Sequence, residues 1–179
     1  MKFIKTFEDW NNVSPELKAH LEEDLNLTNS LFRLGSDAYI KLFEEVKQYW
    51  DKGNIILKGP SGWMAKNLDV GTPAVYTPRG GNQIKVKLDT PKRGGKKKFI
   101  VYRDGGRKDK DGNIIAKKIE WGDPKLSVKN EDPGKAASFW ARHGCDKAGK
   151  MDPMKAGFWA CYGPTLFSKQ LGIKSDQPW

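Results

Sequence analysis

The chain has 179 residues, of which 37% are hydrophobic and 30% charged, and its formal net charge at pH 7 is +10. Seven Trp, eight Phe and five Tyr supply enough apolar surface for a packed core, so the composition excludes a disordered chain. No apolar run approaches the roughly 18 to 20 residues of a membrane span, and the opening MKFIKTFEDW lacks the apolar segment of a signal peptide. We therefore expect no membrane partner.

Charge is distributed unevenly along the chain. Residues 1–51 contain six Lys/Arg and ten Asp/Glu, a net charge of −4, which leaves 26 and 12, or +14, for residues 52–179. Such an asymmetry predicts two surfaces with different partners. We expect an α+β protein with three regions: an acidic helical region at 1–53, a basic β unit at 54–124, and a helical hairpin with a C-terminal arm at 125–179.

The acidic region has two helix starts. Ser14 followed by Pro15 is typical of an N-cap and first helical position, and the leucines at 17, 21 and 25 recur at helical spacing. A second start is expected at Ser36, with an apolar stripe that ends before Gly53.

The basic region changes to short segments rich in β-branched and aromatic residues, separated by Gly, Pro, Asn and Asp. They predict a small antiparallel meander of about five strands at residues 54–58, 74–77, 83–88, 98–102 and 114–121. Within 83–88 apolar residues alternate with Lys85 and Lys87, which predicts one buried and one basic face. The polar connection RDGGRKDKDGN is expected to form a protruding hairpin tip.

The segment 79–98 contains the most basic run of the chain. A solvated loop is one interpretation of this run, and contact with phosphates or an acidic partner is the other. Because the run at 90–98 contains no aromatic residue, it argues for backbone binding and against a stacking platform for single strands. The candidate contact residues are Lys85, Lys87, Lys92, Arg93, Lys96, Lys97 and Lys98.

The C-terminal region nearly repeats itself. Asp132-Pro133 and Asp152-Pro153 each predict an N-cap followed by proline at the first helical position, so we expect a helical hairpin. In the tail, a partner-binding arm is predicted from its apolar residues Leu166, Phe167, Leu171 and Trp179.

The two cysteines lie in this hairpin, and three interpretations stay open. Cys145 and Cys161 could pack as buried groups or form a disulfide. They could instead join His143 as ligands of a structural zinc ion, although Cys161 has no close second ligand. A catalytic thiol is the third interpretation, but no oriented base or substrate cleft is evident.

Enzyme signatures are missing from the sequence. It contains no GxxxxGK[ST], GxGxxG, HExxH or GxSxG pattern, and it has only two histidines. We therefore expect a non-enzymatic protein with no small-molecule substrate and no cofactor other than the zinc ion considered above.

Four segments resemble a module of uncharacterised tailed-phage proteins, including the crAss-like group. They span about residues 96 to 163 and read KKFIVY, IEWGDP, DPG…SFWARHGCD and FWAC. The chain departs from the family in having Trp140 where a basic residue is common, and in the residues that follow Cys161. The family has no assigned reaction.

The resemblance implies a structural or accessory protein of the virion, bound to capsid, portal or tail proteins. Its location would be the virion and, during assembly, the host cytoplasm. The alternative is a phage nucleic-acid-binding protein that contacts DNA through the basic segment 79–98.

Overall fold

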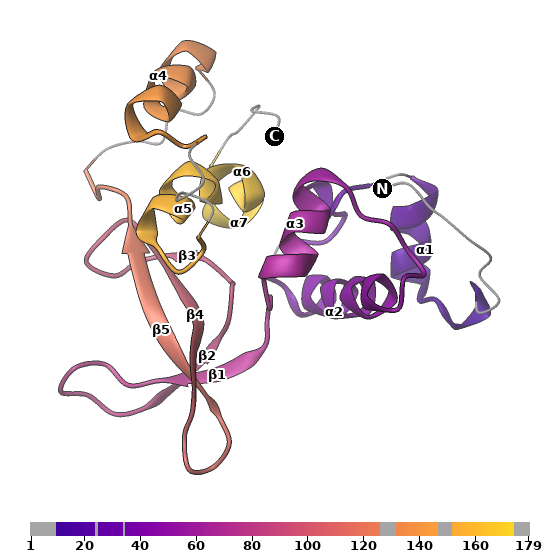
Figure 1. The fold of residues 1–179 in the computed structure, drawn as a ribbon, viewed down its shortest axis with the longest axis horizontal. Coiled ribbons are helices and arrows are strands. Elements are labelled where there is room, and N and C mark those ends of the chain that lie inside the picture. The colour runs from indigo at the N-terminus through magenta and orange to yellow at the C-terminus, as the bar shows by residue number, and fades with distance from the viewer. Residues whose placement is uncertain (1–9, 24, 34, 126–131, 147–151, 174–179) are drawn as a thin grey trace. The chain divides into compact units, whose positions relative to one another are not determined.

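A computed structural model describes residues 10–23, 25–33, 35–125, 132–146 and 152–173 (Figure 1). The chain is an α+β protein that forms two compact units, residues 1–70 and residues 71–178. Among the described residues, no helix has the length and apolar character needed to cross a membrane.

The first unit is helical. Its elements are η1 (Trp10–Asn12), α1 (Pro15–Glu22), η2 (Leu27–Asn29), α2 (Asp37–Asp51) and α3 (Gly59–Asn67). Both predicted helix starts are confirmed, since the Ser14 hydroxyl accepts a hydrogen bond from the Leu17 N–H and the Ser36 hydroxyl accepts one from the Tyr39 N–H. Each cap satisfies one of the backbone donors left free at a helix start.

The strand predicted at residues 54–58 is wrong. This segment contains only an isolated bridge residue, Ile56. The segment leads into α3, a helix that was not predicted from the sequence. Ile55 and Leu57 are buried, so the apolar run supplies core residues instead of a sheet. Pro60 then lies in the first turn of the helix, and the Ser61 hydroxyl accepts a hydrogen bond from the Leu27 N–H at 3.0 Å. The first unit therefore extends beyond residue 53.

A buried histidine fastens the connection after α1. Nδ1 of His20 donates to the carbonyl oxygen of Glu16 at 2.8 Å, so Nε2 of the neutral ring is free to accept. Nε2 accepts from the Leu31 N–H at 3.2 Å and lies 2.8 Å from the Ser30 hydroxyl. His20 is fully buried, and its ring also stacks on Phe32.

We expect His20→Ala to destabilise the first unit by roughly 1 to 3 kcal/mol, because the variant leaves buried polar partners of the imidazole unsatisfied. Urea unfolding followed by far-UV circular dichroism would measure the change. The other histidine of the chain is the matched control: His143 is exposed on α4 (Pro133–His143), and His143→Ala should leave stability nearly unchanged. Equal effects of the two substitutions would contradict the assignment.

The second unit is built on a five-stranded sheet of order β2-β1-β5-β4-β3 (Figure 1). The strands are β1 (Pro73–Tyr76), β2 (Ile84–Lys87), β3 (Lys92–Arg93), β4 (Phe99–Lys108) and β5 (Ile114–Trp121). The predicted meander is wrong in one respect, because β1 pairs with β5 in parallel, at Val75 and Ile115. Of the predicted strands, only 54–58 is absent; β3 is a short strand inside the predicted basic loop.

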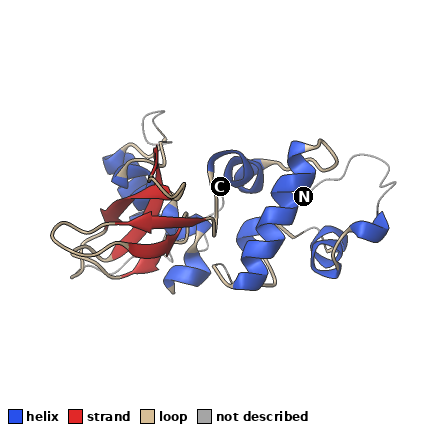
Figure 2. Ribbon diagram, turned by 90° about the horizontal axis from the view of Figure 1, so that it is seen from below, coloured by secondary structure: helices blue, strands red, loops and turns tan. Residues whose placement is uncertain are grey.

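The hairpin of β4 and β5 is the longest pairing of the sheet, whose strands Figure 2 shows in red. Its turn at residues 109–113 is the predicted polar tip, and the Asp109 carboxylate accepts hydrogen bonds from the Asp111 and Asn113 N–H groups at 2.9 Å. A register shift between Asp104 and Lys108 marks a bulge, which bends the hairpin.

The two faces of this hairpin have different environments. Trp121 of β5 faces the C-terminal helices, because its ring lies 5.6 Å from that of Trp159, and Phe99 lies beside it. The alternate positions of β4 and β5 face the other way and form a cluster in the curl of the sheet. The buried members of that cluster are Ala74, Leu88, Ile100, Tyr102 and Ala116.

Among the described residues after the sheet, four short helices follow: α4, α5 (Ala156–Cys161), α6 (Gly163–Leu166) and α7 (Ser168–Leu171). Asp132 caps α4 as predicted, since its carboxylate accepts from the Lys135 N–H at 3.0 Å. The prediction for Asp152 is wrong: its carboxylate accepts from the Met154 N–H in a turn, and α5 begins three residues after Pro153.

The predicted partner-binding arm also needs correction. Leu166, Phe167 and Leu171 are completely buried, and the ring of Phe167 lies 5.7 Å from that of Trp159. These residues are therefore part of the core of the second unit. The apolar tail packs on the sheet of its own chain and not on a partner. Trp179, the fourth predicted residue, lies outside the described residues.

Candidate functional site

The seven cations predicted for the basic segment do not form one patch. Lys85 and Lys87 pair with Val75 and Pro73, so they face away from the cluster that contains Ala74. Lys96, Lys97 and Lys98 lie in the connection between β3 and β4. Only Lys92 stands beside the aromatic side chains in the curl of the sheet.

Arg93 has a structural role that the sequence did not reveal. Its Nε donates to the carbonyl oxygen of Leu171 at 2.9 Å, and a terminal nitrogen donates to that of Gly172 at 3.3 Å. The guanidinium also lies 5.2 Å from the centre of the Phe99 ring. A cation at these carbonyls complements the negative end of a helix, so Arg93 holds α7 against the sheet instead of contacting a ligand.

Two tyrosines and two lysines meet on the opposite face of the sheet. The rings of Tyr76 and Tyr102 lie 5.2 Å apart and are tilted by 51°. The Lys118 ammonium lies 6.0 Å from the Tyr76 ring centre, and that of Lys92 lies 5.9 Å from the Tyr102 ring centre. We call these four residues the tyrosine-lysine patch. Its residues come from β1, β3, β4 and β5, and the first and last of them, Tyr76 and Lys118, are 42 positions apart in the sequence.

Exposure differs among the four. Lys92 is exposed and Tyr76 half-buried, whereas Tyr102 is buried and supports the other ring from behind. Burial also raises the pKa of Tyr102 above its ordinary value, so this phenol stays neutral at physiological pH.

One carboxylate accompanies the patch. Glu120 lies 3.3 Å from the Lys118 ammonium and accepts a hydrogen bond from the Lys96 N–H at 2.8 Å. That backbone hydrogen bond, followed by Lys118, lowers the pKa of Glu120 below its usual value. Glu120 thereby fixes Lys118 near Tyr76 and also fastens the basic connection to β5.

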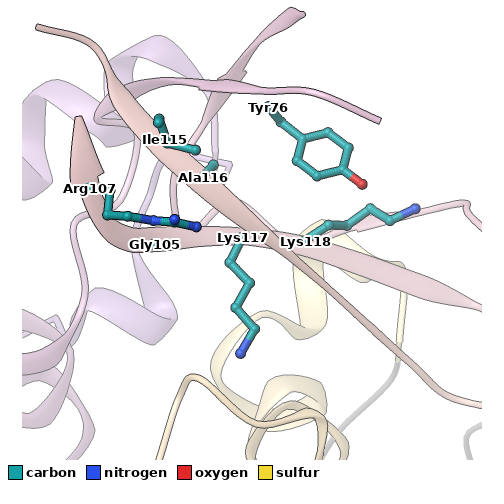
Figure 3. A pocket seen from close by; sticks show the side chains of 7 residues that line it. All are labelled: Tyr76, Gly105, Arg107, Ile115, Ala116, Lys117 and Lys118. Carbon is teal, nitrogen blue, oxygen red and sulfur yellow. The ribbon is translucent and has the colours of Figure 1, made fainter. Parts of the chain in front are cut away.

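A hollow of about 380 Å³ adjoins the patch where β1 separates from β5 (Figure 3). Three of its lining residues are cations and none is acidic, so its electrostatic character favours an anion. Figure 3 shows Tyr76 and Lys118 directed toward each other, whereas Lys117 points away. The lining consists of Tyr76, Gly105, Arg107, Ile115, Ala116, Lys117 and Lys118.

Gly105 lets the bulged strand approach β5 at this hollow. A Cβ atom at residue 105 would lie 2.5 Å from the carbonyl oxygen of Ile115, which is closer than real contacts allow. Only glycine therefore fits this position, and the close approach brings the Arg107 backbone to the edge of the hollow.

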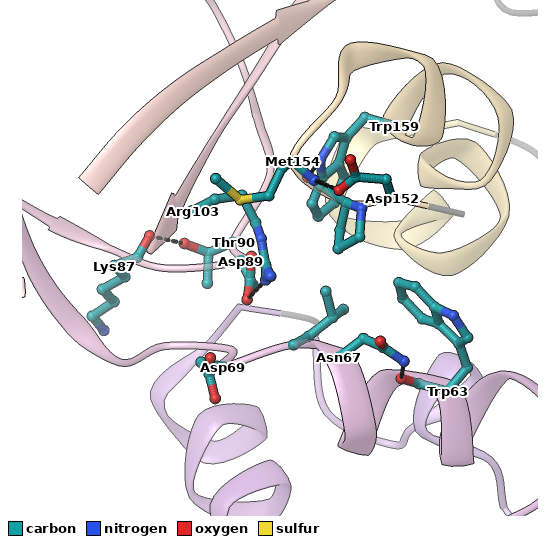
Figure 4. A network of polar contacts seen from close by, with 12 residues as sticks. Trp63, Asn67, Asp69, Lys87, Asp89, Thr90, Arg103, Asp152, Met154 and Trp159 are labelled. Carbon is teal, nitrogen blue, oxygen red and sulfur yellow. Dashed lines mark hydrogen bonds and ion pairs between the residues drawn. The ribbon is translucent and has the colours of Figure 1, made fainter. Parts of the chain in front are cut away.

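A buried ion pair supports the patch from below. The Arg103 guanidinium donates to the Asp89 carboxylate, as Figure 4 shows. The side chain of Asp89 is fully buried and that of Arg103 nearly so. The Asp89 N–H also donates to the carbonyl oxygen of Tyr102 at 2.9 Å. The pair therefore fixes the segment between β2 and β3, and with it the position of Lys92.

The two cysteines are joined in a disulfide. Cys145 and Cys161 have Cα atoms 5.6 Å apart and are both buried, and the Tyr162 hydroxyl donates to the Cys145 carbonyl oxygen. This is one of the three interpretations left open by the sequence. His143, the third predicted zinc ligand, is exposed and its ring lies 4.2 Å from that of Phe139.

A zinc ion would require the reduced protein, because both sulfur atoms are bonded to each other in this state. Within the described ranges, no group of three His, Cys, Asp or Glu side chains is placed to hold a metal ion.

The aromatic part of the site was not predicted from the sequence, because the basic run contains no aromatic residue and Tyr76 and Tyr102 come from other strands. Two signals in the sequence could have indicated this site. One is the pair Lys117 and Lys118 within a predicted strand, and the other is Tyr102, which alternates with Ile100 and so lies on the same face of its strand.

Comparisons of the chain with protein families, with curated proteins and with solved structures gave no match.

We expect reduction of the disulfide to destabilise the second unit by about 3 kcal/mol, the value for closing a loop of about 15 residues. Urea unfolding with and without a thiol reductant would measure the shift, with the variant Cys145→Ser/Cys161→Ser as the reductant-insensitive reference. Alkylation of two thiols in the native, unreduced protein would contradict the disulfide. If the native protein does have two free thiols, elemental analysis of that protein would test whether they bind zinc.

Glu120 should make the stability of the second unit depend on pH. Because folding lowers its pKa, its contribution is present above the unfolded pKa, about 4.3, and disappears as the pH falls through the folded value. Glu120→Gln should therefore flatten the loss of stability below about pH 5, by less than about 1 kcal/mol because the pair is partly solvated. Unfolding midpoints between about pH 7 and pH 3 would measure this. Glu44→Gln, at an exposed position of α2, is the control, and identical pH profiles of wild type and Glu120→Gln would contradict the role.

Proposed function

We propose that the protein is a non-enzymatic nucleic-acid-binding protein and that the open face of its sheet contacts the ligand. The observation that supports the proposal is the tyrosine-lysine patch, continuous with a hollow that is lined by three cations and no acid. Patch and hollow share Tyr76 and Lys118, so they form one surface.

The chemistry of this surface suits a phosphodiester backbone. Lysine and arginine side chains neutralise phosphates and release condensed counterions, which supplies most of the affinity of sequence-independent binding. Lys92 and Arg107 are exposed and available for such contacts. Aromatic rings beside cations are the second component of surfaces that bind nucleic acid.

This proposal revises the surface expected for the basic segment 79–98. Arg93 is committed to α7, and the only acid of that segment, Asp89, is paired with Arg103. Of the seven predicted residues, Lys92 belongs to the proposed surface, whereas Lys85 and Lys87 face the other way. Arg107 and Lys118 replace them.

A role in a tailed-phage particle is the second proposal, and the resemblance over about residues 96 to 163 favours it. Attachment to capsid, portal or tail proteins stays a prediction. Mass spectrometry of purified particles tests it: a fixed copy number per particle would support a virion component, and absence of the chain would leave a protein of the infected cytoplasm.

We expect binding to oligonucleotides to weaken steeply with salt, and the variant Lys92→Gln/Lys118→Gln to reduce the slope of log affinity against log salt by about two. At low salt its affinity should fall roughly tenfold or more. Fluorescence anisotropy with labelled oligonucleotides would measure both quantities.

The matched control is Lys41→Gln/Lys66→Gln, which removes the same charge from exposed positions of α2 and α3. If the control weakens binding as much as the patch variant does, net charge alone explains the affinity. Absence of binding by the wild type at low salt would exclude the proposed function.

A further inference from the structure

We infer that the hollow beside Tyr76 takes one unpaired base, so that the protein prefers single-stranded over double-stranded nucleic acid. The inference rests on the proposed function and names the ligand class that the same surface selects. Its starting point is the position of Tyr76, which belongs both to the patch and to the lining of the hollow.

The Tyr76 ring is held in place. Tyr102 lies behind it, and the Lys118 ammonium lies 6.0 Å from its centre. A ring held in this way loses little conformational entropy when a base stacks on it. Tyr102 itself is only 7% exposed, so Tyr76 is the one ring of the pair that a base can reach.

The hollow has the size and lining for such a ligand. Its volume of about 380 Å³ lies near the lower end of the range for small-molecule sites, which suits a single base better than a larger group. Ile115 and Ala116 supply apolar contact, while Arg107 and Lys118 supply charge for the phosphates on either side of the base.

A second apolar contact continues the surface from β1 onto β2. Ile84 is the cross-strand partner of Tyr76, and it is 45% exposed, one of only two large hydrophobic side chains exposed to this degree among the described residues. Adjacent to the aromatic ring, it offers a flat apolar contact for the neighbouring base.

A duplex cannot use these contacts. Its bases are stacked on each other, so their faces are unavailable until a base is unpaired and unstacked, which costs a few kcal/mol. A single strand offers free base faces at little cost, and stacking on an aromatic side chain tolerates any base. The hollow therefore converts general phosphate binding into a preference for single strands without sequence specificity.

The test compares an oligothymidylate of about 15 nucleotides with a duplex of the same length, both by fluorescence anisotropy at low salt. Tyr76→Leu removes the ring and keeps apolar bulk, and Tyr76→Phe keeps the ring. We expect Tyr76→Leu to lose about 5- to 150-fold in affinity for the single strand, the measured range for one stacked base, with the duplex affected less than about twofold. Tyr76→Phe should bind the single strand as the wild type does.

A photo-crosslink supplies a readout that needs no variant. An oligonucleotide carrying 5-iodouracil is irradiated with the wild-type protein, and the crosslinked residue is identified by mass spectrometry. Attachment at Tyr76 supports the inference; attachment only at other residues overturns it.

The outcomes separate the two proposals. If the wild type binds single strand and duplex equally well, or Tyr76→Leu keeps its affinity for the single strand, the inference fails while nucleic-acid binding stands. If neither oligonucleotide binds at low salt, the proposed function itself fails. If a thermal melt shows that Tyr76→Leu is unfolded, its loss of affinity carries no information, and the crosslink to the wild-type protein tests the inference instead.

Discussion

The buried ion pair between Asp89 and Arg103 is the constraint on which the second unit depends. It joins the segment between β2 and β3 to the middle of β4, and it does so inside the sheet where neither charge is well solvated. Removing one partner would leave an uncompensated buried charge, a change that typically costs about 3 to 5 kcal/mol. Asp89 also has a positive φ of 50°, a conformation that aspartate tolerates better than most residues. Aspartate can adopt this backbone conformation, and its carboxylate accepts a hydrogen bond from Arg103. Both properties explain why the chain turns at Asp89, before β3 begins.

From this connection onward, the two faces of the sheet serve different purposes. The residues after Asp89 alternate: Lys92 pairs with Ile100 and faces the curl, whereas Arg93 pairs with Phe99 and faces the helices. The helix-facing side is then closed by Arg93 at the end of α7 and by the rings of Trp121, Trp159 and Phe167. On the other side, none of the helices that the structure describes covers Tyr76, and Lys92 stays exposed. A one-residue shift of β3 would exchange the two roles, so the register that Asp89 sets also determines which cation is available.

Local signals in the sequence were sufficient for three of the four predicted helix caps, four of the five strands and the hairpin tip. Ser14, Ser36 and Asp132 act through neighbouring backbone groups, which is why their roles could be predicted without the fold. Apart from the wrong cap at Asp152, the errors have a common cause, since they concern apolar or basic segments whose environment is set by distant residues. The run at 54–58 looks like a strand, but the core of the first unit buries it. Arg93 looks like part of a basic loop, but its acceptors are 78 and 79 residues away. The parallel pairing of β1 with β5 leaves no local trace at all.

The disulfide and the proposed binding surface lie on opposite faces of the same sheet. Cys161 belongs to α5, which packs on the Trp121 side, whereas Tyr76 and Lys118 line the open side. A cytoplasm that keeps thiols reduced would therefore weaken the cover of helices without changing the side chains of the proposed binding surface. What holds the open face is the ion pair and the strand pairing, neither of which contains sulfur. The near-repeat around the cysteines, the most conspicuous feature of the sequence, thus belongs to folding, whereas the proposed binding surface consists of residues that become neighbours only when four strands pair.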